Sequence, residues 1–590
     1  MQVLEKYFDT AFDAPDGIKK LRELILTLAM QGKLVPQDPN DKPASELLKE
    51  IEKEKQQLIK DGKIKRPKPL MQIQNNEMLF KIPRSWKWCK LADVSLYIQR
   101  GKGPSYVEDS PYKVISQKCV RWYGLDLKQA RSIDAESLEK YEEIRLLQRN
   151  DLLWNSTGTG TIGRACLIAD DLNNQVLVAD SHVTVVRPHK INAEFLLCWI
   201  KSPYVQNEIV NIASGTTNQI ELNTSTVINH IIPLPPLNEQ KRIVEKINKL
   251  MALCDELEKL KEQKEAKKLT VHKSAINQLL DSKDNSNSQK GWHFISNHFN
   301  DLYTVKENVS ELRSAILQLA MQGKLVSQNP NDQPASELLK EIEKEKQQLI
   351  KDGKIKRPKP LMQIQNNEML FKIPRSWKWC KLADVSLYIQ RGKGPSYVED
   401  SPYKVISQKC VRWYGLDLKQ ARSIDAESLE KYEEIRLLQR NDLLWNSTGT
   451  GTIGRACLIA DDLNNQVLVA DSHVTVVRPH KINAEFLLCW IKSPYVQNEI
   501  VNIASGTTNQ IELNTSTVIN HIIPLPPLNE QKRIVEKINK LMALCDDLEK
   551  QIENSSSKQT QLLNAIMSNL GKKYAIKICF YQRVQKSKRV

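Results

Sequence analysis

The stretch Leu234-Pro-Pro-Leu-Asn-Glu-Gln-Lys-Arg-Ile-Val244 ends a globular segment and begins a long helix, and it occurs again at 525–535. Beyond it, apolar residues return in alternating steps of four and three, which is the spacing of a coiled-coil seam. Each helix is expected to be about 60 Å long at 1.5 Å per residue. The predicted seam consists of Ile243, Ile247, Leu250, Cys254 and Leu257 in the first helix and Ile534, Ile538, Leu541, Cys545, Leu548 and Ile552 in the second.

Both seams become polar midway, at Lys261, Lys264 and Lys268 in the first helix and at Ser555 and Gln559 in the second. Antiparallel pairing would bring polar centre to polar centre and apolar end to apolar end. It would also place the two globular segments at opposite ends of a rod, about a pseudo-twofold axis. The alternative is a pair of ordinary surface helices.

An internal repeat accounts for the two helices. Pro43–Asp255 recurs as Pro334–Asp546 at a constant offset of 291, without a single substitution over 213 residues. Weaker similarity extends upstream, where Leu28–Val35 matches Leu319–Val326. A unit of this size is large enough to bury its own core, so the chain is predicted to hold two copies of one domain set rather than a solenoid.

Each copy has the same predicted order of elements. A short amphipathic helix that ends near Gly32 precedes a charged helix over about 45–61, and a basic, proline-containing link follows. The stretch from about 80 to 236 has short β-branched runs with frequent Gly and Pro, which indicates a loop-rich mixed α/β domain. The predicted fold class is therefore α+β, with two mixed α/β domains separated by a pair of long antiparallel coiled-coil helices.

Composition narrows the class of protein. The 590 residues carry a net charge of +16, which favours a polyanionic partner. No apolar run approaches the ~20 residues of a membrane-spanning helix, and the first residues lack the apolar segment of a signal peptide, so a cytoplasmic protein is expected. The eleven cysteines include no CxxC or CxxH pair. They are predicted to be reduced, mostly buried thiols rather than metal ligands.

Two short motifs suggest catalysis or cofactor binding, and neither is in a suitable context. Gly158-Thr-Gly-Thr-Ile-Gly163 fits GxGxxG, but a strand-like run follows it instead of a helix, so a hairpin turn is predicted. Asp180-Ser-His182 holds triad residue types, but neighbouring strand residues point to opposite faces, which favours a structural role. A phosphate loop and the Asn/Asp-Pro-Pro-Tyr/Phe motif of amino-methyltransferases are both missing. No catalytic, cofactor-binding or metal-binding residue is predicted in this chain.

In its short sequence motifs, the chain resembles the specificity subunits of type I restriction-modification systems over nearly its whole length. The similar motifs include Leu28–Leu34, Ile82–Trp88, Thr159–Arg164, Ser214–Gln219 and Leu234–Val244. They occur in the order typical of the family, once in each copy. The resemblance implies two target recognition domains that each read half of a split DNA sequence. It also implies helices that act as a ruler and as a docking surface for two methyltransferase subunits, which restriction subunits join. S-adenosylmethionine, ATP and Mg²⁺ are expected on those partners.

The corresponding boundaries are an N-terminal helical region, a recognition domain, a coiled-coil helix and a linker, followed by a second set of the first three elements and a basic tail. In that order they span 1–70, 71–237, 238–283, 284–308, 309–361, 362–528, 529–571 and 572–590.

Charge distribution points to the first half of each recognition domain as the DNA-facing part. Residues 81–131 contain eleven Lys or Arg and four Asp or Glu, whereas 133–180 contain four and nine. Trp122 is interpreted as a core residue. The candidate DNA contacts are Arg100, Lys102, Lys113, Gln117, Lys118, Arg121, Asn155, Thr157, Thr159, Arg164, Thr216, Thr217, Asn218 and Gln219, with their counterparts Arg391, Lys393, Lys404, Gln408, Lys409, Arg412, Asn446, Thr448, Thr450, Arg455, Thr507, Thr508, Asn509 and Gln510. A solvated basic face is the alternative for each of them.

Because identical domains should read identical half-sites, the hypothesis is that the target is an interrupted palindrome. Members of the family usually have dissimilar domains and asymmetric targets, so the chain departs from their pattern. A partner methyltransferase would flip out the base to be modified, which is expected to be adenine. Two other classes of function stay open at this point: a coiled-coil scaffold or regulator without sequence-specific DNA binding, and a self-sufficient methyltransferase or nuclease.

Overall fold

The computed structural model describes residues 12–158, 160–169, 175–213, 221–281, 285–430, 432–449, 451–460, 466–504 and 512–572. The chain forms two compact units: unit 1 comprises Met1–Gln263 and Ser555–Val590, and unit 2 comprises Lys264–Asn554. Lys264 and Ser555 are 291 residues apart, which is the offset of the repeat. Each unit therefore consists of one copy completed by a helical segment from the other copy.

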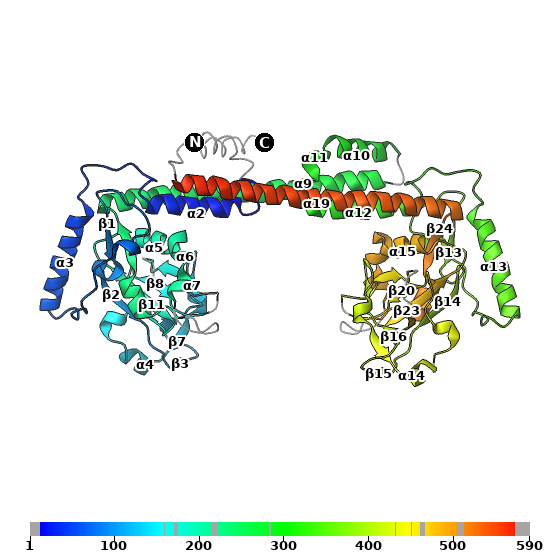
Figure 1. Cartoon of the computed structure of the whole chain (residues 1–590), viewed down its shortest axis with the longest axis horizontal. Coiled ribbons are helices and arrows are strands. Elements are labelled where there is room, and N and C mark those ends of the chain that lie inside the picture. The colour runs from blue at the N-terminus through cyan, green and yellow to red at the C-terminus, as the bar shows by residue number, and fades with distance from the viewer. Residues whose placement is uncertain are drawn as a thin grey trace. The chain divides into compact units, whose positions relative to one another are not determined.

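The elements of the first copy, several of which are labelled in Figure 1, run from α2 to α9. They are α2 (Gly17–Met30), α3 (Ala44–Lys60), β1 (Lys87–Lys90), β2 (Ser95–Arg100), β3 (Tyr106–Val107), β4 (Tyr112–Ile115), β5 (Val120–Arg121), β6 (Gly124–Leu125), β7 (Arg131–Ile133), α4 (Ala135–Glu139), β8 (Leu152–Asn155), β9 (Ala165–Leu167), β10 (Val176–Ala179), β11 (Val183–Pro188), α5 (Ala193–Lys201), α6 (Pro203–Gln206), α7 (Ile209–Ile212), α8 (Thr224–Asn229), β12 (Ile231–Leu234) and the long helix α9 (Leu237–Leu280).

The second copy repeats this order after two additional helices, α10 and α11. Its elements are α10 (Asn285–Asn297), α11 (Phe299–Leu302), α12 (Lys306–Met321), α13 (Ala335–Lys351), β13 (Lys378–Lys381), β14 (Ser386–Arg391), β15 (Tyr397–Val398), β16 (Tyr403–Ile406), β17 (Val411–Arg412), β18 (Gly415–Leu416), β19 (Arg422–Ile424), α14 (Ala426–Glu430), β20 (Leu443–Asn446), β21 (Ala456–Leu458), β22 (Val467–Ala470), β23 (Val474–Pro479), α15 (Ala484–Lys492), α16 (Pro494–Gln497), α17 (Ile500–Ile503), α18 (Thr515–Asn520), β24 (Ile522–Leu525) and the long helix α19 (Leu528–Lys572).

The globular domain of unit 1 is built on two four-stranded sheets. One sheet has the order β2-β11-β8-β9 and is antiparallel throughout. The other has the order β10-β4-β7-β3, in which only the β10–β4 pair is parallel. The short pairs β5–β6 and β1–β12 complete the domain, and unit 2 contains the same four sheets. Two similar mixed domains separated along the chain by a long helix confirm the predicted fold class.

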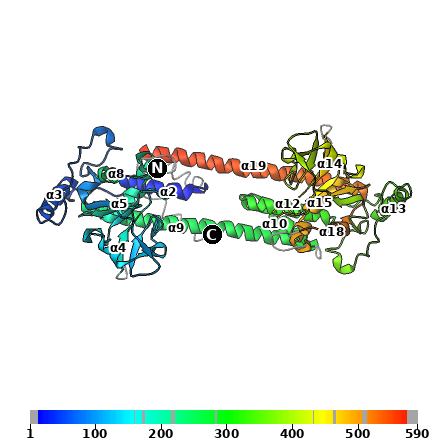
Figure 2. The same cartoon turned by 90° about the horizontal axis from the view of Figure 1, so that it is seen from below.

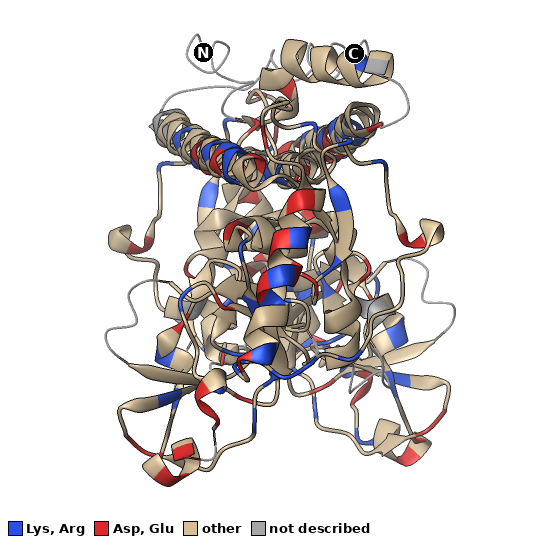
Figure 3. Ribbon diagram, turned by 90° about the vertical axis from the view of Figure 1, so that its right-hand side faces the viewer, with Lys and Arg blue, Asp and Glu red and all other residues tan. Residues whose placement is uncertain are grey.

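The short helices end where the sequence predicts. Gly32 and Gly62 follow α2 and α3 with φ of +68° and +71°, a conformation that closes a helix and suits glycine. Lys33 N–H then donates to Leu28 O at 2.9 Å, which satisfies a carbonyl of the last helical turn. Acidic and basic residues alternate along α13, the counterpart of α3 in unit 2, as Figure 3 shows.

The long helices are shared between the units. Helix α9 starts in unit 1 and ends in unit 2, whereas α19 starts in unit 2 and ends in unit 1, so their directions are opposite. In unit 1 the predicted seam is buried from Ile243 to Cys254, and it joins Leu563 and Ile566 of α19 in one apolar cluster. The same cluster contains residues of α2, which packs against both long helices (Figure 2), and of the globular domain.

In unit 2 an equivalent cluster joins Ile534, Ile538 and Cys545 of α19 to the last turns of α9. Leu257, Leu541, Leu548 and Ile552 are only partly buried, although they pack against these clusters. An ion pair fastens the short helix to the long one in each unit, because Arg22 contacts Asp255 at 2.6 Å and Arg313 contacts Asp546 at 2.6 Å.

One predicted boundary is wrong. The segment 284–308 was expected to be a linker, but α10 and α11 occupy most of it, and Ile295 and Leu302 are buried in the core of unit 2. The polar run Asn285–Ser288 hid this helix, because its apolar residues begin only at Trp292. The basic tail beyond Lys572 lies outside the described residues. In the described part of the chain, no helix combines the length and apolarity needed to cross a membrane.

Candidate nucleic-acid interface

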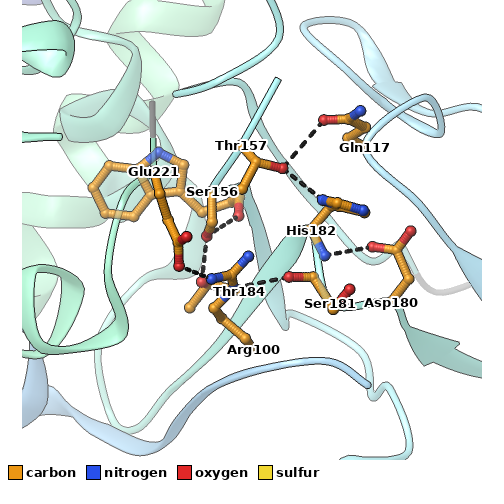
Figure 4. A network of polar contacts seen from close by, with 10 residues as sticks. Arg100, Gln117, Ser156, Thr157, Asp180, Ser181, His182, Thr184 and Glu221 are labelled. Carbon is orange, nitrogen blue, oxygen red and sulfur yellow. Dashed lines mark hydrogen bonds and ion pairs between the residues drawn. The ribbon is translucent and has the colours of Figure 1, made fainter. Parts of the chain in front are cut away.

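Three loops meet on the globular domain of unit 1: the β4–β5 loop (116–119), the β8–β9 turn (156–164) and the β10–β11 turn (180–182). The Thr157 hydroxyl shares a hydrogen bond of 2.7 Å with His182 Nδ1 and lies 3.5 Å from Gln117 Oε1 (Figure 4). Thr161 also donates to Gln117 Oε1 at 3.2 Å. These contacts join one polar side chain from each loop into what we call the three-loop surface.

A buried asparagine fixes the loops beneath this surface. Asn155 has no exposed area, and its Nδ2 donates to Gln117 O at 3.0 Å and to Thr161 O at 3.2 Å. Asn155 and its counterpart Asn446 were expected to contact DNA, and this expectation is wrong because their side chains are sealed from solvent. The amide is instead the clamp that holds the β4–β5 loop against the β8–β9 turn.

The glycine-rich segment is a hairpin turn, as predicted. It connects the antiparallel strands β8 and β9, so no helix N-terminus follows it to bind a phosphate. Gly158, Gly160 and Gly163 have φ of +98°, +77° and +83°, which side chains rarely adopt. A Cβ at Gly163 would also lie 2.6 Å from Ile209 Cγ1. Backbone geometry therefore explains the glycines without a nucleotide.

The Asp180-Ser181-His182 segment is the β10–β11 turn and not part of a strand. The argument that neighbouring strand residues point to opposite faces is therefore wrong for this segment. Asp180 Oδ1 accepts from His182 backbone N–H at 2.8 Å, and Ser181 O accepts from Arg100 Nε at 2.8 Å. The three side chains form no proton relay. The His182 side chain is exposed and tied to Thr157, so sequence reasoning missed a member of the three-loop surface.

Arg100 does not lie in a flexible basic loop. It is the last residue of β2, with only 23% of its side chain exposed, and its guanidinium also forms an ion pair with Glu221. Arg391 and Glu512 repeat this pair in unit 2. A carboxylate and a carbonyl therefore already hold the guanidinium in place, so Arg100 is not a free basic side chain.

The side chains of two predicted lysines form contacts outside the three-loop surface. Lys113 is on β4 and donates to Ser132 Oγ at 2.8 Å, on the neighbouring strand β7. Lys102 is exposed and donates to Lys140 O at 2.7 Å. Lys404 repeats the Lys113 contacts in unit 2, and Lys393 lies over the Tyr432 ring as Lys102 lies over Tyr141. Closeness in sequence to Gln117 did not place these residues beside it.

The other candidates divide into four groups. The three loops of unit 1 contain Gln117, Lys118 and Thr157, and the equivalent loops of unit 2 contain Gln408, Lys409 and Thr448. Arg164 and Arg455 end the β8–β9 and β20–β21 turns and donate to Gly160 O and Gly451 O. Arg121 and Arg412 lie on the β5–β6 and β17–β18 hairpins with partly buried side chains. Thr159, Thr450, Thr216, Thr217, Asn218, Gln219, Thr507, Thr508, Asn509 and Gln510 lie outside the described residues.

Trp122 is not a core residue, contrary to the prediction. Trp122 is 41% exposed and Tyr123 is 81% exposed, at the end of the β5–β6 hairpin. Both line an apolar cleft of about 850 Å³ with residues of α2, α5, α6 and α9, including Leu197 and Met251. Lys201 Nζ donates to Trp122 O at 2.8 Å, and burial lowers the pKa of this lysine.

The side chains offer no metal site in the part of the chain that the structure describes, because no three His, Cys, Asp or Glu residues there are arranged to hold one. The ten cysteines described are all free, eight of them buried and two partly exposed. Burial raises the pKa of Cys166 to about 12, so this thiol is not a ready nucleophile.

The family model and the curated relatives that the chain matches point to one family. The family model described as "Type I restriction modification DNA specificity domain" matches residues 83–268 and 374–555. The EcoEI specificity subunit of Escherichia coli is 32% identical over 573 residues, and the EcoAI specificity subunit of Escherichia coli is 33% identical over 568, with 93% of each chain covered in both cases. Among solved structures, the HsdS subunit from Thermoanaerobacter tengcongensis is 17% identical, with 84% of this chain and 98% of that one covered and a TM-score of 0.38.

Proposed function

The chain belongs to the family of type I restriction-modification DNA specificity subunits, and from this premise we propose that it reads a bipartite DNA sequence through its two three-loop surfaces. The observation that carries the proposal is the clamped cluster of Gln117, Thr157 and His182, which recurs in unit 2 as Gln408, Thr448 and His473. Glutamine can read adenine in the major groove, and hydroxyl and imidazole groups can bond to either base edges or phosphates.

Rigid support favours sequence reading over general attraction to phosphate. The Asn155 clamp and the Arg100–Glu221 pair fix the backbone of the loops before DNA binds. The loops therefore lose little conformational entropy on binding. Lys118, exposed in the β4–β5 loop, supplies a positive charge beside the polar cluster. In this proposal Arg100 positions the β10–β11 turn and does not touch DNA.

The chain is the non-catalytic member of a complex with methyltransferase and restriction subunits. We infer that it holds two methyltransferase subunits, one for each recognition domain, and that S-adenosylmethionine, ATP and Mg²⁺ bind to those partners. In this arrangement a partner methyltransferase flips out and modifies a base, which we expect to be adenine. The complex would work in the cytoplasm, where its DNA substrate lies.

Because the three-loop surfaces of the two units have the same sequence, the proposed target is an interrupted palindrome. The test is methylome sequencing of DNA modified by this subunit with its cognate methyltransferase. A single interrupted palindrome modified on both strands is the expected result. An asymmetric modified site would refute identical reading by the two domains. No modification by a demonstrably active partner would favour the scaffold function instead.

A further inference from the structure

One of the differences between the two copies is a buried contact where the long helices enter the units. His272 of α9 and Tyr303, just after α11, are both buried in unit 2. His272 Nε2 and the Tyr303 hydroxyl share a hydrogen bond of 2.9 Å, with ring centroids 5.2 Å apart. At the equivalent positions, 291 residues away in each case, unit 1 has Leu563 and Phe12. Both are buried in its apolar cluster.

In each pair, one residue belongs to a unit's own copy and the other to the helical segment that the unit receives from the other copy. His272 lies in the second half of α9, which begins in unit 1 but contributes residues 264–280 to unit 2. Leu563 lies in the second half of α19, which contributes its last turns to unit 1. Tyr303 and Phe12 precede the short helices α12 and α2 of the receiving units. The pairs therefore lie where a unit contacts its incoming helix.

A second copy of the chain offers an alternative pairing. The first halves of α9 and α19 are identical from Leu237 to Asp255, so α9 could pair with α9 of another chain, and α19 with α19. Unit 1 would then receive His272 opposite Phe12, and unit 2 would receive Leu563 opposite Tyr303. Each contact would bury a polar group opposite an apolar side chain, which is unfavourable unless the group finds another partner.

Helix α10 adds a steric difference that also disfavours pairing with a second copy. A Cβ at Gly291 of α10 would lie 2.7 Å from Ala275 O and 2.7 Å from Leu279 N, so α10 lies directly against the backbone of α9. The counterpart of Ala275 in α19 is Ile566. In unit 2, α10 therefore lies over Ala275 of α9, where α19 would present the larger Ile566.

We propose that the buried His272–Tyr303 pair in unit 2 and the apolar Leu563–Phe12 pair in unit 1 form a pairing lock that directs α9 to α19 of the same chain and against the matching helix of a second copy. A polar residue at a seam position is an established way to set partner choice between helices. The first halves of α9 and α19 have the same seam, so discrimination has to come from contacts of the second halves such as this one. The proposal does not depend on which DNA sequence the protein reads.

The test uses full-length chains with two different affinity tags, mixed, unfolded and refolded together over a range of concentrations. Capture on one tag and detection of the other measures chains that have paired with a second copy, and light scattering measures their mass. The variant H272L/Y303F gives both units the apolar pair, and F12Y/L563H gives both the polar pair. Each uses a pair that one unit already accommodates, so folding is expected to survive.

In both variants the units no longer differ at this contact, so mixed-tag dimers should increase by roughly tenfold over the wild type. The fourfold variant F12Y/H272L/Y303F/L563H exchanges the pairs between the units and should return mixed-tag dimers to the wild-type amount. Equal amounts in the wild type and both twofold variants would overturn the lock. So would a fourfold variant that dimerises like the twofold ones.

Discussion

At the scale of single residues, we assign base reading to Gln117 and attraction of phosphate to Lys118, both on the three-loop surface. Gln117→Ala together with Gln408→Ala should weaken binding to the specific target by about 1–3 kcal/mol per half-site and leave non-specific binding nearly unchanged. Lys118→Ala together with Lys409→Ala should weaken both kinds of binding and reduce the salt slope by about one for each lysine that contacts a phosphate. Binding to specific and random duplexes at several salt concentrations distinguishes the two.

The matched control at this scale is Lys113→Ala with Lys404→Ala. These lysines belong to the same basic half of the domain but donate to Ser132 and Ser423 on a neighbouring strand. Their removal should leave the salt slope unchanged. A slope that falls as much as for Lys118 would mean that the DNA covers the β4–β7 sheet as well.

A buried histidine in each unit makes stability depend on pH. Burial lowers the pKa of His230 and of His521 from 6.5 to about 4, and each ring packs against a tryptophan at 5.3 Å. Between these pKa values only the unfolded chain binds the proton, so stability is complete above pH 6.5 and decreases as the pH falls toward 4. The loss should reach about 2–3 kcal/mol per histidine.

Denaturant unfolding at pH 7 and pH 4.5 measures this loss. His230→Gln with His521→Gln keeps an acceptor for the Trp199 and Trp490 indole N–H groups but removes the titrating ring. The variant should therefore lose less stability on acidification than the wild type. Equal losses would assign the pH dependence to other groups.

At the scale of elements, the β8–β9 turn depends on a clamp from outside itself. Asn155→Ala would leave the carbonyls of Gln117 and Thr161 without their amide donor, at a cost of about 1–3 kcal/mol. Specific DNA binding should fall further than stability predicts, because the Gln117 loop loses its fixed position. The unfolding free energy and the specific affinity of the variant check both parts. A variant with reduced stability and intact specificity would contradict the clamp.

Elements with a regular spacing of apolar residues could be predicted from the sequence, whereas the burial and partners of single side chains could not. The spacing of four and three from Ile243 predicted the long helices, and Gly32 and Gly62 predicted the ends of the short ones. Asn155 was expected at the surface and is buried, whereas Trp122 was expected in the core and is exposed. Burial within a short strand or hairpin depends on which sheet covers it. Arg100 was misplaced for a related reason: its partner Glu221 lies 121 residues away, and a local pattern carries no information about such a contact.

At the scale of the whole molecule, each unit has its own core and its own copy of the three-loop surface. Substituting Gln117 and His182 in unit 1 alone should relax one half of the target and leave the other half unchanged. The corresponding substitutions of Gln408 and His473 in unit 2 alone should give the same set of modified sites, because an interrupted palindrome reads identically in both directions. Methylomes of the two variants test this. Different methylomes would show that the units are not equivalent on DNA.

The Asn155 clamp also bears on how such a protein evolves. The residues that would face the bases sit on loops whose backbone is held by buried amides and obligatory glycines, so the loop side chains can mutate while their scaffold is retained. With two identical copies, one can drift while the other keeps its original reading. A few substitutions confined to one copy would then turn a symmetric target into an asymmetric one, and the host would acquire a new barrier to foreign DNA without a new fold.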